Sequence, residues 1–250
     1  MTVSCKCNLG LNLAESNLSV HNQMMIKFTP ILLALIYGYI MYRFSAWRTK
    51  ANLDKNSTLL AYKPIMLLTN QMARSLDLHE IKVHIYEIEA VNGLAAPDGR
   101  IFTTRGFLKK YYNKEVTASE LVSVIAHELG HVALCHSRKR MIDFSGQNAM
   151  RVALMMILNR FIPGVGALIA NFLTSLLAAK LSRKDEYEAD AYASALLTKS
   201  EIGVKGQKDL LNKLEKISSG AGNMPAWLLS HPKTQSRIKA IEKLEQTWQK

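Results

Sequence analysis

Cysteine is scarce in this chain of 250 residues: Cys5, Cys7 and Cys135 are too few and too unevenly spaced for a disulfide scaffold. A metal pair formed by Cys5 and Cys7 is a weak alternative, and Cys135 is expected to be a small buried hydrophobic residue. Hydrophobic residues make up 48% of the chain and charged residues 21%, which excludes a disordered chain. The length suits one sizeable domain with an anchor.

Acidic residues are also few, 20 against 32 basic residues, so the formal net charge is +12. Such an excess can indicate nucleic-acid binding. Here the basic residues are scattered, they do not alternate with aromatic residues, and the chain has no glycine-rich loop. We therefore predict no nucleic-acid partner and attribute the excess to an anionic membrane surface.

The N-terminal region contains the one long uncharged run near the start of the chain. Residues 1–23 are polar and without periodicity, which predicts a flexible tail. Residues 28–42 carry no charge, and with Lys27 and Arg43 at its ends the segment 24–44 reaches the ~20 residues that a bilayer requires. A cleaved signal peptide is the alternative, but no pair of small residues at cleavage spacing follows. We predict a transmembrane anchor at 24–44.

The charges around this segment predict a topology. Lys6 and Lys27 precede most of the apolar segment, and several basic residues follow it closely, from Arg43 to Lys63. This charge bias predicts a single-pass protein of the inner or plasma membrane, with the following domain, residues 45–250, in the cytoplasm. If translation starts at Met24 or Met25, the periplasmic side is the alternative, because the preceding tail is then only a few residues long.

The residues His127, Glu128, Leu129, Gly130 and His131 form the pattern H-E-x-x-H. Residues four apart project from one face of a helix, so His127 and His131 can bind one metal ion while Glu128 lies beside it. By chance the pattern would occur in roughly one chain in a hundred of this composition. A pair of hydrogen-bonded core histidines is the alternative interpretation.

The helix that carries this pattern has a clear start. Thr117 and Glu120 form a T-x-x-E capping box, which predicts a helix beginning near Ala118. A proline-free apolar run follows, and the basic cluster 138–140 suits a C-terminal turn. We predict that the helix ends near this cluster.

A zinc ion needs a third protein ligand, and Glu186 is the candidate. Glu186 and Asp190 are four residues apart and share a helix face. One can therefore bind the metal while the other orients a metal-binding side chain through a hydrogen bond. Ser182 and Asp185 are plausible caps for this helix, and Glu188, on another face, is expected to be solvated. An acidic helix start favoured by the macrodipole is the alternative.

Together these segments resemble a known family. H-E-L-G-H at 127–131 followed by S-R-K-D-E-Y-E-A-D at 182–190 is similar to the membrane-associated zinc peptidases of the HtpX and CAAX-protease type, gluzincins whose third ligand is the first Glu of E-x-x-A-D. Residues 92–106 are similar to the segment of this family that contains its substrate-binding edge strand. Ser230-His231-Pro232, followed by Arg237-Ile238, is similar to its late H-P-x-x-x-x-R-I motif.

The resemblance implies the roles of individual residues. His127, His131 and Glu186 would bind one zinc ion per chain, Glu128 would be the general base, and Asp190 would fix the tautomer of a ligand histidine. His231 would assist catalysis near the metal, although a histidine before proline is often only a turn residue. The segment implied to bind substrate comprises Asn92, Gly93, Leu94 and Ala95, together with Arg237. Gly93 and Leu94 depart from the Ala and bulky aromatic residue frequent in the family.

This set of residues agrees with hydrolytic chemistry. Three protein ligands leave the fourth tetrahedral position to water, whose pKa zinc lowers to about 7. A neighbouring carboxylate can accept the proton as hydroxide attacks an amide carbonyl. We therefore predict a zinc-dependent endopeptidase.

The remaining patterns predict the fold class. It is mainly α with a small β-sheet (α+β), and the resemblance implies a zincin-like gluzincin helical core, preceded by the transmembrane helix. Apolar residues at 150–181 predict a helical hairpin that packs on the core or lies at the membrane surface. The other expected elements are a helix at 63–75, strands at 81–88 and 100–104, and two amphipathic helices at 208–217 and 234–248.

The predicted function is a membrane-anchored zinc endopeptidase in protein quality control. Membrane or misfolded proteins as substrates are implied by the resemblance alone. The alternative is a non-catalytic pseudo-peptidase that holds client peptides at the edge of the sheet.

Overall fold

The computed structural model describes residues 32–33, 36–37, 39–40, 43–96, 98–220 and 234–248. The chain divides into two compact units, Met1–Ser45 and Ala46–Lys250. The predicted tail lies outside the described residues, as does most of the predicted anchor, of which the described residues are helical and exposed. Among the residues described, no helix combines the length and the apolar composition needed to cross a bilayer.

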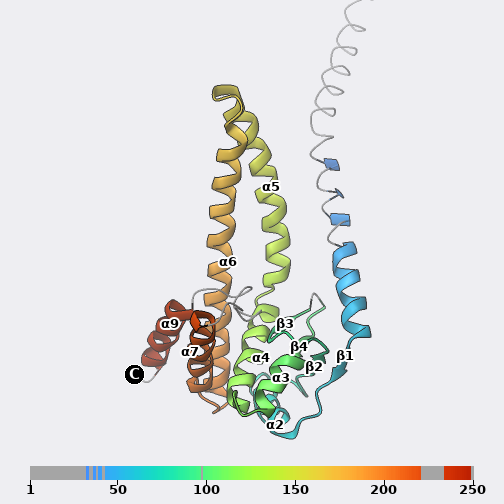
Figure 1. Cartoon of the computed structure of the whole chain (residues 1–250), viewed down its shortest axis with the longest axis vertical. Helices are drawn as coiled ribbons and strands as arrows, with labels where there is room; N and C mark the ends of the chain where they lie inside the picture. Colours follow the sequence, from blue (N-terminus) through green and yellow to red (C-terminus); the bar gives the residue numbers. More distant parts are fainter. Residues whose placement is uncertain are drawn as a thin grey trace, which may run out of the picture. The chain divides into compact units, whose positions relative to one another are not determined.

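The second unit is mainly helical, as predicted, with one small sheet (Figure 1). After a helix over residues 46–55 its elements are, in order, β1 (Ser57–Leu59), α2 (Lys63–Ser75), β2 (Val83–Tyr86), β3 (Gly93–Ala95), β4 (Ile101–Thr104), α3 (Arg105–Tyr112), α4 (Ala118–Ala133), α5 (His136–Phe161), α6 (Gly166–Lys199), α7 (Lys205–Gly220) and α9 (Thr234–Trp248).

The sheet has the strand order β1-β2-β4-β3. Its central pair β2 and β4 is parallel, and the outer pairs β1–β2 and β3–β4 are antiparallel. β2 and β4 lie within the predicted strands 81–88 and 100–104. In the described part of the chain, β3 is therefore an edge strand.

Helix α4 is the centre of the hydrophobic core. Its N-terminus is closed by the predicted capping box, in which the Thr117 side chain accepts from the Glu120 backbone and the Glu120 carboxylate accepts from the Thr117 backbone. The apolar side chains that α4 buries almost completely are Leu121, Val122, Ile125 and Ala126. A helix buried on most sides leaves little freedom to the polar groups it carries.

The predicted end of α4 is wrong. The helix ends at Ala133, and Cys135 has a left-handed backbone with φ of 55° before α5 begins at His136. The basic cluster 138–140 thus lies at the start of α5. The expectation that Cys135 is buried is also wrong, because the left-handed turn leaves this cysteine exposed.

Helices α5 and α6 lie side by side as a long hairpin that projects beyond the rest of this unit (Figure 1). Gly164, with φ of 83°, lies in the turn between them. α6 continues through Ser182 without a break, so the prediction of a helix start there is wrong. The residues before Ser182 favour helix and include no breaker after Gly166, so the possible caps Ser182 and Asp185 end up in the helix interior.

The N-terminal half of α6 has two unlike faces. Small residues such as Ala170 and Thr174 are buried at 0% and 7% exposure. The large apolar side chains on the other face are exposed, namely Leu168, Phe172, Leu173 and Leu176. The hairpin therefore packs through its small residues and presents its large ones outward.

Candidate metal centre

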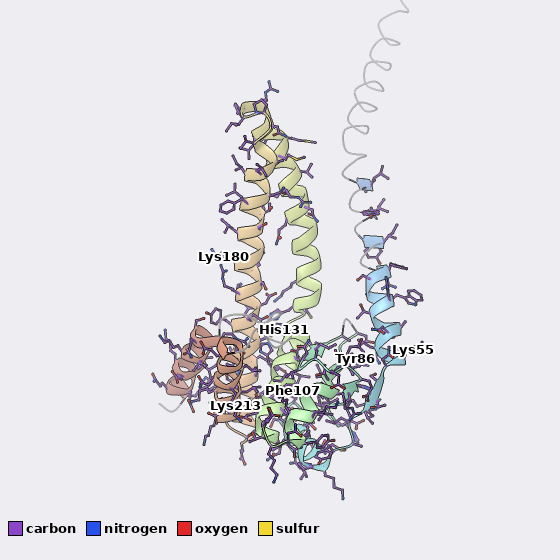
Figure 2. All side chains as sticks on the ribbon, viewed as in Figure 1. Lys55, Tyr86, Phe107, His131, Lys180 and Lys213 are labelled. Atoms are coloured by element: carbon purple, nitrogen blue, oxygen red, sulfur yellow. The ribbon has the colours of Figure 1, made fainter. Side chains whose placement is uncertain are left out.

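The two histidines of the H-E-x-x-H pattern lie on the buried face of α4. His127 and His131 are 2% and 6% exposed, and their Nε2 atoms are 3.1 Å apart. Figure 2 shows His131 at the level where the hairpin meets the rest of the unit. One turn of helix separates the two residues, which explains why their rings reach the same point.

Helix α6 adds a carboxylate to this point. The Glu186 oxygens lie 3.5 Å from Nε2 of His127 and 3.6 Å from Nε2 of His131. The helices approach closely because of Gly130, where a Cβ atom would lie only 2.9 Å from the Ala189 carbonyl oxygen. The structure thus brings together the three predicted metal ligands from segments more than 50 residues apart.

The three side chains fit a divalent metal ion. One potential ligand atom from each lies within 4.8 Å of the others, and all three residues are buried. Burial alone would lower the pKa of His127, but hydrogen bonds with Asp190 and Glu186 outweigh burial and raise this pKa to about 9. Groups that attract a proton so strongly also attract a cation, and two imidazoles with one carboxylate form a donor set that zinc prefers.

Asp190 lies behind His127, on the side away from Glu186. Its Oδ1 is 2.9 Å from Nδ1 of His127, and it accepts hydrogen bonds from the Arg237 guanidinium, with Nη2 at 2.7 Å. Burial raises the pKa of Asp190, but Arg237 and His127 lower it by more, to about 2. The carboxylate therefore stays ionised and can hold the Nδ1–H tautomer that leaves Nε2 of His127 free to bind metal.

Glu128 and the edge strand β3 meet beside the ligands. Glu128 is 3% exposed, and a Cβ on Gly93 would lie 3.6 Å from its Oε1. The same Cβ would overlap Val124 Cγ1 at 2.4 Å, so only glycine lets β3 lie this close to α4. Leu94 and Ala95 continue the strand, which pairs with β4 on one side, and Asn92 lies immediately before it.

His231 lies outside the described residues. Arg237, predicted to bind substrate, is 1% exposed and its guanidinium faces Asp190.

Sequence reasoning missed His136. This residue is 1% exposed, and its Nδ1 lies 2.8 Å from Nδ1 of His131. Its other nitrogen, Nε2, is 3.2 Å from a carboxylate oxygen of Glu188, which is therefore not simply solvated. His136 follows His131 by five residues, and in a continuous helix this spacing does not put two side chains on the same face. The contact depends on the left-handed turn at Cys135.

The fold and the site define a metallopeptidase, and comparison with known proteins agrees. Residues 61–245 match the model of peptidase family M48, so the chain belongs to this family and is a hydrolase. The predicted resemblance is confirmed.

Among the relatives, the chain is 29% identical to metalloprotease LoiP of Escherichia coli over 72% of this chain and 68% of LoiP. It is 24% identical to the human mitochondrial metalloendopeptidase OMA1 over 80% of this chain. It is 26% identical to a protease HtpX homolog of Bordetella pertussis over 87% of this chain and 83% of the homolog. The chain spans only 40% of the length of human OMA1.

Proposed function

We propose that this chain is a membrane-anchored zinc endopeptidase with one zinc ion bound by His127, His131 and Glu186. The observation that carries the proposal is the convergence of these three buried side chains, with ligand atoms within 4.8 Å, in a member of family M48. Zinc would supply Lewis acidity and lower the pKa of a water molecule, which are the requirements for peptide hydrolysis near neutral pH.

The chain's own residues supply the rest of the chemistry. Glu128 takes the proton from the attacking water and passes it to the leaving amine, as a buried carboxylate next to a ligand can do. Asp190 holds His127 in the binding tautomer, and Arg237 keeps Asp190 charged and in place. His231, from the H-P segment, is proposed to stabilise the oxyanion.

The proposed substrate is an extended peptide that pairs with β3. An edge strand has free backbone groups on its outer side, and a peptide can add to it as a further strand. Gly93, Leu94 and Ala95 form this strand and Asn92 precedes it, and a Cβ atom on Gly93 would lie in van der Waals contact with Glu128. Membrane or misfolded proteins, and hence protein quality control, are the substrates and role that we propose from the family resemblance.

The α5–α6 hairpin is proposed to enter a lipid bilayer. The sequence from Phe144 to Lys184 has no acidic residue. Its large apolar residues are exposed on both helices, including Met156, Phe161 and Phe172 at 68%, 75% and 63%. Such exposure is unusual for a water-facing surface and suits lipid chains.

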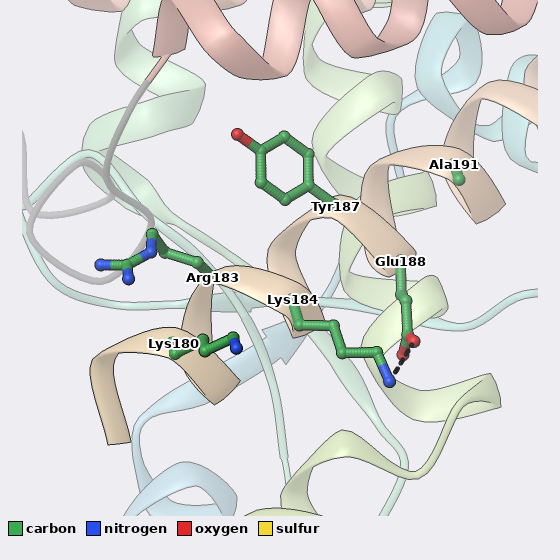
Figure 3. A pocket seen from close by; sticks show the side chains of 6 residues that line it. All are labelled: Lys180, Arg183, Lys184, Tyr187, Glu188 and Ala191. Atoms are coloured by element: carbon green, nitrogen blue, oxygen red, sulfur yellow. Dashed lines mark ion pairs between the residues drawn. The ribbon is translucent and has the colours of Figure 1, made fainter. Parts of the chain in front are cut away.

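Basic residues at the base of the hairpin suit anionic lipid headgroups. Lys180, Arg183 and Lys184 lie with Tyr187 around an open hollow of about 450 Å³ on α6 (Figure 3). Cations and an aromatic ring at this level are typical of a membrane interface. We propose a transmembrane anchor at 24–44 and, from the charge rule, a catalytic domain in the cytoplasm.

The catalytic proposal is tested by Glu128→Gln. Loss of the general base should lower casein hydrolysis by about 10²–10⁴-fold while zinc content stays at one per chain. Glu115→Gln, at an exposed glutamate paired with Lys110, is the matched control and should keep wild-type activity. Equal turnover of Glu128→Gln and wild type would favour the non-catalytic, client-binding alternative.

The membrane proposal is tested with the full chain in vesicles that contain brominated lipids. In a chain whose three native tryptophans are changed to phenylalanine, the tryptophan of Phe172→Trp should be quenched strongly, and that of Lys205→Trp, at the exposed start of α7, should not. Equal quenching at both positions would contradict insertion of the hairpin.

A further inference from the structure

We infer that His136 and Glu188 are positioning residues that fix the tautomer and orientation of His131, as Asp190 does for His127. This inference rests on the proposed zinc site. It assigns a role to a buried histidine that no part of the H-E-x-x-H or E-x-x-A-D patterns includes.

The local backbone places His136 against His131. Cys135 adopts φ of 55°, which ends α4 and makes His136 the first residue of α5. Because of this turn, the His136 ring lies behind His131 and is 1% exposed. The two Nδ1 atoms are 2.8 Å apart, which is a short hydrogen bond between imidazoles.

The count of protons determines the direction of this hydrogen bond. A histidine that binds metal through Nε2 carries its proton on Nδ1. His131 therefore donates from Nδ1, and His136 must accept at its own Nδ1. A neutral His136 then carries its proton on Nε2, the atom that faces the carboxylates of α6.

Glu188 is the acceptor for that proton. Its Oε2 lies 3.2 Å from Nε2 of His136, whereas the nearest oxygen of Asp185 is 3.9 Å away, beyond hydrogen-bond length. Lys184 holds Glu188 from the other side at 3.5 Å (Figure 3). The chain of contacts is thus Glu188, His136, His131 and the metal position.

The same proton count argues against a second metal site. His136, Asp185 and Glu188 could by their spacing hold a cation of their own. That cation would need the lone pair of His136 Nε2, which carries the proton as long as His131 binds metal through Nε2. The cluster therefore acts as support for His131.

The two supports differ in structure. His127 contacts a buried carboxylate directly, and this carboxylate is paired with Arg237. At Nδ1 of His131 the contact is with a second imidazole, which in turn contacts Glu188, and the Glu188 side chain is 36% exposed. We therefore expect the His136 support to contribute less to zinc affinity than Asp190.

The test compares zinc dissociation constants of two variants of the full chain in detergent, by competition with a chelator. His136→Phe keeps a ring but removes the acceptor, and zinc affinity should fall about 10–100-fold. His136→Gln offers an amide oxygen to the His131 N–H and should restore most of this loss. Glu115→Gln should bind zinc as wild type does.

A merely structural role predicts a different result. If the two His136 variants lose zinc affinity equally, or if His136→Phe keeps wild-type affinity, the inference is wrong. A wild-type chain that binds two zinc ions, one of them lost in Glu188→Ala, would also overturn it.

Nitrogen-15 spectra of the zinc-bound wild-type chain test the proton positions without any variant. We expect protons on Nδ1 of His131 and on Nε2 of His136, and a proton on Nδ1 of His136 would overturn the inference. If wild type binds no zinc at all, the proposed function itself fails. Normal zinc binding with unchanged affinity in His136→Phe removes only the role of His136.

Discussion

The two halves of helix α6 have opposite surroundings. Helix α6 packs against α4, α9 and α2, and in its C-terminal half Glu186, Asp190 and Leu197 are at most 2% exposed. From Leu168 to Leu176 the large apolar side chains are exposed. The buried half thus holds polar groups that need partners, and the exposed half holds apolar groups that need a covering. The two halves of one helix therefore underlie the two proposals made above, a metal ion at the buried half and a lipid phase at the exposed half.

Removing the ligand from the buried half should have the largest effect. In Glu186→Ala the site keeps two imidazoles only, and loss of the metal removes several kcal/mol of transition-state stabilisation, on the order of 10³-fold in rate. Metal analysis and casein hydrolysis measure this change. A Glu186→Ala chain that retains zinc and activity would show that another residue is the third ligand.

The proton on His127 predicts a pH dependence of metal binding. Because its pKa is raised to about 9, His127 in the metal-free chain is protonated at neutral pH and must lose this proton to bind zinc. Affinity should therefore rise with pH up to about 9, about tenfold for each unit for one displaced proton. Calorimetry in buffers of different ionisation enthalpy counts the protons released. No proton release at pH 7 would contradict the raised pKa.

The crossing of α4 and α6 should be sensitive to a single methyl group. In Gly130→Ala the new Cβ meets the backbone of Ala189, so the helices must separate, at a cost of about 1–3 kcal/mol in the free energy of unfolding. Thermal unfolding of the metal-free chain measures this cost. Ala133→Ser, at an exposed position of the same helix, is the control and should unfold as wild type does.

The exposed half should give the smallest effect on folding. Phe172→Ser removes a side chain that is 63% exposed, so the free energy of unfolding in detergent should change by no more than about 0.5 kcal/mol. Zinc affinity should also stay unchanged. A loss as large as that of Gly130→Ala would mean that Phe172 packs within the protein, and the contrast between the two halves would disappear.

The features that the sequence predicted well depend on local chemistry. The capping box of Thr117 and Glu120 gave the start of α4, and Pro64 in the first turn agrees with the start of α2. The mainly helical class with a small sheet is confirmed, because these periodic patterns are strong. The family was identified from ordered motifs, and the match over residues 61–245 confirms it.

The features that the sequence did not predict depend on tertiary structure or on rare backbone states. Nothing in the residue type of Cys135 indicates a left-handed conformation, so the end of α4, the exposure of Cys135 and the contact of His136 with His131 were all missed. The polar residues Ser182 and Asp185 were taken as a helix start, although the packing of α6 on α5 continues the helix through them. Glu188 was expected to be solvated because its partner His136 comes from another helix.

The unbroken course of α6 has a geometric consequence. Ten residues separate Leu176 from Glu186, and at 1.5 Å per residue this is a rigid spacing of about 15 Å. Under the proposed function, the peptide bond that is cut lies at this fixed distance from the exposed apolar segment. The position of cleavage would then depend on its distance from the surface that covers Leu176, and not on the side chains of the substrate.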